Sequence, residues 1–175
     1  MGKLLSLRER LLAKEERLPK AVPKLVQSSP HFSIIPRTDF AVGVPVAFDN
    51  SIKEALISAS KGPRGPVGSR CVVMLVSIEG KKTMPQGLVL EQIIAMGWAG
   101  ASLQVLAGFI RECFVQNILH EMPVLALGAP FVDGLKFSYA PRFLYKKPPG
   151  SSLLGVVPVS RIQPDWLILV TRTVK

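Results

Sequence analysis

An uncharged apolar run from Ile93 to Ile110, IIAMGWAGASLQVLAGFI, constrains this chain more than any other stretch. Glu91 bounds it on one side and Arg111 on the other. A membrane-spanning helix needs about 20 mostly apolar residues, with about 17 as the lower limit, so the run is just long enough to cross a bilayer. A helix buried in a globular core is the alternative, and it would have the same composition. The length of the run favours the membrane span.

Small and polar residues would gather on one side of this helix. At helical spacing Gly97, Ala101, Gln104 and Gly108 share a face. Small residues let two helix backbones approach closely, and an amide among them can form a hydrogen bond with a neighbouring helix. The pattern therefore predicts a helix-packing face. Prolines near both ends of the apolar region place one long central helix over residues 84–122.

The composition combines apolarity with positive charge. Of the 175 residues 48% are hydrophobic, and Lys+Arg number 22 against 12 Asp+Glu, for a net charge of +10. A membrane protein beside anionic lipid or an acidic partner explains both properties, whereas an RNA-coating protein explains the charge alone. The basic residues are also spread along the chain, and this spacing weakens the case for RNA binding.

The N-terminal stretch KLLSLRERLLAKEERL predicts an amphipathic helix, because its leucines fall on one side and its charges fill the rest. Such a helix docks on a membrane surface or in a partner's groove, or it covers its own domain. The chain begins MGKLLS, which matches the pattern for myristoylation at Gly2, with Ser6 in the favoured position.

The predicted fold class is mostly α, with irregular extended arms and a few short strands. Prolines break the chain on both sides of the central helix, and β-branched runs at Cys71–Ile78 and Trp166–Thr171 indicate strands. The predicted segments are a docking helix (1–18), a proline-rich arm (19–50), a short helix with a basic Gly/Pro loop and a strand (51–83), the central helix (84–122), and an irregular C-terminal arm with short strands (123–175).

No residue pattern in the chain indicates catalysis. The two histidines, His31 and His120, and the two cysteines, Cys71 and Cys113, do not have the spacing of metal ligands. The serines lack a nucleophile elbow, and the acidic residues are scattered singly. The sequence therefore predicts no catalytic, metal-binding or cofactor-binding residue, and the chain is not expected to be an enzyme.

One stretch brings aromatic and basic residues together. Tyr139, Arg142, Tyr145, Lys146 and Lys147 could stack on and neutralise single-stranded nucleic acid. They could also anchor the chain at a lipid interface, where tyrosines and cations favour the headgroup layer. An ordinary solvated surface is the third interpretation.

These observations predict a non-catalytic accessory subunit of a large membrane protein complex, with the mitochondrial inner membrane as a candidate location. One membrane helix and extended arms would stabilise the assembly, and its partners would be the other subunits and anionic lipid. The alternative is a basic structural protein of a ribonucleoprotein, such as a mitochondrial ribosome. In that case the apolar helix is core and the partner is nucleic acid.

Overall fold

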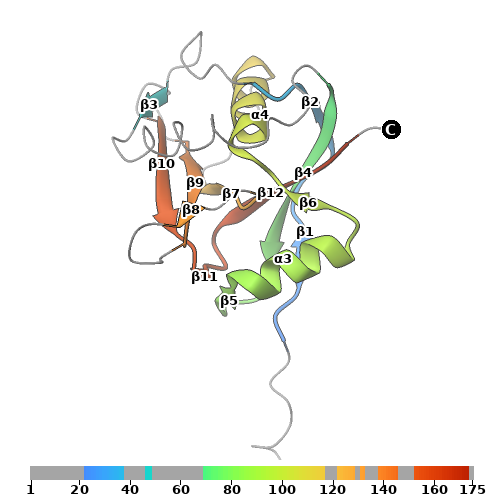
Figure 1. Cartoon of the computed structure of the whole chain (residues 1–175), viewed down its shortest axis with the longest axis vertical. Helices are drawn as coiled ribbons and strands as arrows, with labels where there is room; N and C mark the ends of the chain where they lie inside the picture. Colours follow the sequence, from blue (N-terminus) through green and yellow to red (C-terminus); the bar gives the residue numbers. More distant parts are fainter. Residues whose placement is uncertain are drawn as a thin grey trace, which may run out of the picture.

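A mixed β-sheet forms the centre of the protein (Figure 1). The structure is a computed structural model that describes residues 22–37, 46–48, 69–116, 122–128, 131–132, 138–145 and 152–173. Within these residues the sheet has ten strands, and hydrogen-bonded neighbours follow the order β1-β4-β12-β7-β9-β10-β3. These are β1 (Leu25–Gln27), β4 (Cys71–Ile78), β12 (Leu167–Thr173), β7 (Val124–Ala126), β9 (Ser138–Leu144), β10 (Ser152–Pro158) and β3 (Val46–Phe48).

Shorter strands complete the sheet and form a second, smaller one. In the large sheet, β2 (Phe32–Ile34) pairs with β4, β6 (Ala99–Gly100) with β12, and β8 (Phe131–Val132) with β9. Next to it, β5 (Met84–Pro85) and β11 (Arg161–Ile162) form a two-stranded sheet. The pairs β12–β7 and β10–β3 are parallel and the others are antiparallel, so the sheet is mixed.

The two described helices cover opposite faces of the sheet. The alternation of side chains along β4 sends Val73 and Leu75 into one core cluster, with helix α4 (Leu103–Val115). Met74 enters a second cluster with helix α3 (Gln86–Ala95). We call these clusters the α4-side core and the α3-side core. In Figure 1, α4 lies above the central strands and α3 below them.

The predicted long central helix over 84–122 is wrong, because the chain breaks in its middle. Gly97 has a φ of +78°, the left-handed conformation that ends helices. Two backbone hydrogen bonds close the end of α3, one from Gly97 to the Ile94 oxygen (2.9 Å) and one from Trp98 to the Ile93 oxygen (3.1 Å). After β6, Ser102 begins α4, and its Oγ accepts a hydrogen bond from the Val105 N–H at 3.3 Å.

The predicted fold class, mostly α, is therefore also wrong. The apolar run belongs to both cores, since Ile93 is buried beneath α3 and Ile110 is buried beneath α4. Within the described residues, neither helix has the length and hydropathy needed to cross a bilayer. The prediction of a transmembrane helix is therefore wrong. The predicted membrane location depended on that helix, and the structure does not support it.

Several predictions fall on residues that lie outside the described part of the chain. These are the docking helix at 1–18 with Gly2, the predicted short helix after residue 50, and most of the basic Gly/Pro loop. β4 covers the residues Cys71–Ile78, for which the sequence predicts a strand, and β12 covers most of the stretch predicted near the C-terminus.

The segment after β2 lies directly against α4. A Cβ atom added to Gly108 would overlap the carbonyl oxygen of Ile35, so only glycine allows this close approach. One turn earlier in α4, the carbonyl oxygen of Gln104 accepts a hydrogen bond from the Arg37 N–H at 2.9 Å. Together these contacts hold the chain that follows β2 against the helix.

A side chain of α3 similarly holds the chain that enters β1. The Gln92 Oε1 atom accepts a hydrogen bond from the Leu25 N–H at 2.8 Å, and its Nε2 atom donates one to the Pro23 carbonyl oxygen at 2.9 Å. The backbone groups of this edge segment are thus paired with a helix instead of another strand, which protects the edge.

We predict that Gly108→Ala lowers the free energy of unfolding by about 1–3 kcal/mol, because the new methyl group forces α4 and Ile35 apart. Urea denaturation measures the change. Gly87→Ala is the matched control, since Gly87 lies in α3 with nothing within 4 Å of an added Cβ. That control should be neutral or stabilising by up to about 1 kcal/mol. Equal stability of the two variants would contradict the close approach.

We also predict that Gln92→Leu destabilises the protein by about 1–3 kcal/mol, since two partly buried backbone groups lose their partner. Hydrogen exchange at the Leu25 amide should accelerate more than exchange in β12. Glu91→Gln, at an exposed position on the same helix, serves as the control. If the Leu25 amide kept its protection in Gln92→Leu, another group would have to hold β1.

Candidate nucleic-acid interface

Aromatic and basic side chains meet at the end of the sheet where β4 begins and β12 ends. The rings of His31 and Trp98 lie 5.2 Å apart between centroids, at an interplanar angle of 55°. The Cζ atom of Arg172 lies 4.7 Å from the centroid of the Trp98 ring, a cation–π distance. His31 and Arg172 are exposed and Trp98 is half-buried, so these groups lie at the surface.

Strand alternation and the turn after α3 bring these residues together. In β12 the side chain of Arg172 follows Ile168 and Val170 on the α3 side of the sheet. The left-handed turn at Gly97 directs Trp98 back onto that face, where its ring packs against the α3-side core. His31 enters from the segment that leads into β2.

Arg70 lies at the same end of the sheet, directly before β4. Arg70 Nη1 donates a hydrogen bond to Ser33 Oγ at 3.5 Å. Ser33 in β2 is paired with Val72 in β4, and Val72 is paired with Arg172 in β12. Arg70 therefore bonds to the strand on one side of β4, and Arg172 belongs to the strand on the other side, at the same end of the sheet. Both are exposed. We call His31, Arg70, Trp98 and Arg172 the Trp98 cluster.

The Trp98 cluster carries positive charge without a compensating carboxylate. Among the described residues neither Arg70 nor Arg172 forms an ion pair with an Asp or Glu, and Arg172 rests on an indole ring. A guanidinium is a good ligand for phosphate, and an aromatic face is a good surface for stacking a base. The cluster therefore places an exposed aromatic ring, that of His31, at the same end of the sheet as two guanidinium groups.

The structure does not place the sequence-predicted aromatic and basic residues on one surface. Tyr145 is buried in the α4-side core, with its ring centroid 6.2 Å from that of Phe114. Arg142 is half-buried in β9, and its buried Nε atom has no hydrogen-bond partner among the residues that the structure describes. Tyr139 is half-buried in the same strand, while Lys146 and Lys147 lie outside the described residues.

The four residues of the predicted helix-packing face also separate. Gly97 lies in the turn after α3, and Ala101 is buried before α4 begins. Gln104 and Gly108 lie within α4, where Gly108 packs against the backbone of Ile35 in the same chain.

Within the described part of the chain, no group of three or more His, Cys, Asp and Glu residues lies close enough to hold a metal ion. His31 contacts an indole ring, as described above. Both cysteines are buried. Burial raises the pKa of the Cys71 thiol, and it raises the pKa of Cys113 to about 12, with a smaller contribution from the charge of Glu112.

Sequence reasoning missed the Trp98 cluster because its members come from four separate stretches of the chain. Trp98 lies within the apolar run, and Arg70 lies between the basic Gly/Pro loop and the strand predicted at Cys71–Ile78. The only local signal was Gly97 before Trp98, which marks a helix end and an exposed turn. The pairing of β4 with β12, which brings Arg70 and Arg172 to one end of the sheet, cannot be predicted from the sequence around either residue.

Comparisons with known proteins identify no relative of this chain. The chain matches no protein-family model, and searches of curated proteins and of solved structures return no significant match.

We predict that both cysteines resist alkylation in the folded protein. The raised pKa keeps the Cys113 thiol protonated, and burial excludes the reagent. This thiol favours folding below its ordinary pKa of 9.0, and the contribution is lost as the pH rises from there towards about 12. Mass spectrometry after iodoacetamide treatment near pH 8 should show labelling only in denaturant. Rapid labelling of native Cys113 would contradict its position in the core.

Proposed function

We propose that this protein binds single-stranded nucleic acid as a non-catalytic, basic component of a ribonucleoprotein. The observation that carries the proposal is the Trp98 cluster, in which two aromatic rings and two guanidinium groups share one end of the sheet, with no ion pair to either guanidinium among the described residues. The basic residues are scattered in the sequence, which argued against RNA binding, but the fold brings Arg70 and Arg172 to one end of the sheet.

The geometry favours a single strand over a duplex. Stacking on an aromatic ring requires an exposed base face, which a single strand offers and a duplex hides within its stack. The Trp98 ring packs against the α3-side core and carries the Arg172 guanidinium over it, and the exposed ring of His31 lies next to it. A base would stack on the exposed His31 ring while the guanidinium groups contact the adjacent phosphates.

The other sequence-based function, an accessory subunit of a membrane complex, depended on a membrane helix. The apolar run that suggested it is divided between two cores instead. A ribonucleoprotein component needs no such helix. Its net charge of +10 would contribute to binding, because a basic protein attracts the phosphate backbone.

Fluorescence anisotropy with a fluorescein-labelled oligouridine tests the proposal. Arg172→Gln should weaken binding about threefold to tenfold and reduce the slope of log K against log salt by about 0.7, the value for one phosphate contact on a single strand. His31→Ala should weaken binding at all salt concentrations with little change of slope, because stacking is not ionic.

Two controls make the result specific. Arg161→Gln removes an exposed cation of the β5–β11 sheet and should keep the wild-type affinity and slope. A duplex of the same length should bind more weakly than the single strand. Equal effects of Arg161→Gln and Arg172→Gln would show that binding depends on general charge, and it would contradict a site at Trp98.

A further inference from the structure

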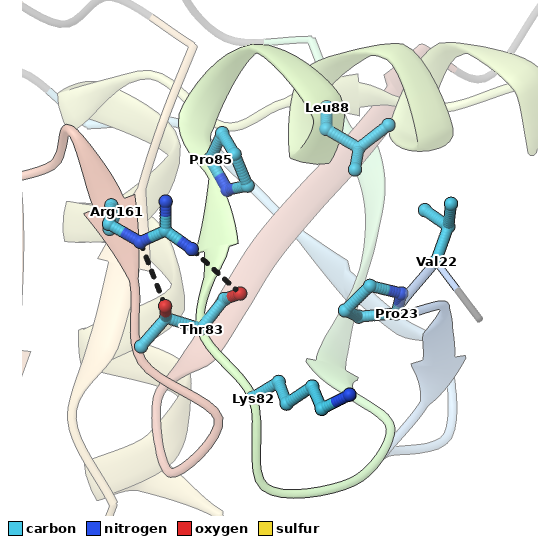
Figure 2. Close-up of a pocket in the computed structure, with 7 residues that line it drawn as sticks. All are labelled: Val22, Pro23, Lys82, Thr83, Pro85, Leu88 and Arg161. Carbon is cyan, nitrogen blue, oxygen red and sulfur yellow. Dashed lines mark hydrogen bonds between the residues drawn. The ribbon is translucent and has the colours of Figure 1, made fainter. Parts of the chain in front are cut away.

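An open pocket lies where the chain entering β1, the turn after β4, and the β5–β11 sheet meet (Figure 2). Its volume is about 430 Å³, within the range of ligand pockets. Seven residues line it: Val22, Pro23, Lys82, Thr83, Pro85, Leu88 and Arg161.

One part of the pocket is aliphatic and rigid. Pro85 is paired with Arg161 in the β5–β11 ladder, which fixes its ring. Leu88, in the first turns of α3, packs against the α3-side core and is half-buried. The carbonyl oxygen of Pro23 accepts the hydrogen bond from Gln92, while Val22 leaves 58% of its surface exposed. An apolar side chain from a ligand would find a preformed surface here.

The other part is cationic. Arg161 Nε donates to Thr83 Oγ1 at 2.9 Å, and Nη2 donates to the Thr83 carbonyl oxygen at 3.4 Å. Figure 2 shows the third nitrogen of this guanidinium pointing away from Thr83, with the ammonium group of Lys82 across the lower part of the pocket. Both cations are exposed, and neither forms an ion pair within the described residues.

We propose that this pocket binds an acidic segment of a partner protein, with an aliphatic side chain on Pro85 and Leu88 and carboxylates on Arg161 and Lys82. No acidic residue is among the described residues that line the pocket, so its charge is complementary to an acidic ligand. The net charge of +10 also steers acidic partners towards the molecule.

The lining distinguishes this pocket from the Trp98 cluster. It has no aromatic ring on which a base could stack, so an aliphatic peptide fits it better than a nucleotide. The two sites also lie at opposite ends of β4. Leu25, which follows the pocket segment, pairs with Ile78 at the end of β4, whereas Ile34 pairs with Cys71 at its beginning. The pocket therefore goes beyond nucleic-acid binding and is independent of it.

Anisotropy of a fluorescein-labelled peptide, Gly-Glu-Glu-Leu-Pro-Glu-Leu-Glu-Gly, tests the proposal with the full-length protein. Arg161→Gln should weaken binding about fivefold to tenfold, because a carboxylate of the peptide loses an oriented guanidinium partner. Lys82→Gln should weaken it about threefold, as expected for a mobile exposed cation. Lys81→Gln, at the adjacent exposed position outside the pocket, is the matched control and should change little.

A second peptide, with serine in place of both leucines, separates the aliphatic contact from charge alone. It should bind at least about fivefold more weakly than the leucine peptide. Equal binding of the two peptides, or equal effects of Lys81→Gln and Arg161→Gln, would overturn the proposal. Displacement of the peptide by oligouridine in the Arg172→Gln variant would assign the pocket to nucleic acid and would also overturn it.

Discussion

The antiparallel pairing of β4 with β12 is the interaction on which the rest of the structure depends. Its register runs from Ile168 opposite Val76 to Thr173 opposite Cys71, and both faces of the pair are covered by apolar cores. A strand pair buried on both sides must be apolar at consecutive positions, as the sequence of β4 is. The edge strands β1 and β2, the short strand β6 and parallel β7 all pair with one of these two strands.

The same strand pair also separates the two candidate binding surfaces. At one end, Arg172 in β12 lies over the ring of Trp98, where we propose that nucleic acid binds. At the other end, the turn that follows β4 leads to Thr83, which orients Arg161 above an aliphatic pocket. One small basic protein could thereby hold a nucleic acid and an acidic protein partner at once. A ribonucleoprotein component that connects its RNA to a neighbouring protein would need both.

Part of this fold could be predicted from local sequence. The β-branched run at Cys71–Ile78 indicated a strand, and that stretch is β4. Gly97 and Ser102, which end α3 and begin α4, are ordinary helix stop and start signals within the apolar run. The length of that run favours one continuous helix, whereas these two signals favour a break within it. The prediction of a helix over 84–122 follows the length and is wrong for that reason. A buried helix and a membrane helix have the same composition, so composition could not decide between them. The break at Gly97 decides, because it leaves helices too short to cross a bilayer.

The sequence by itself determined which segments are apolar enough to be buried, where two central strands lie, and that the molecule is basic. Only the tertiary structure decided that the apolar run is divided between two faces of a sheet, because that depends on strand pairing between distant segments. The Trp98 cluster arises in the same way. Arg70 and Arg172 come to one end of the sheet through the register of β4 and β12, and this register is set by the cores on both faces and not by either segment alone.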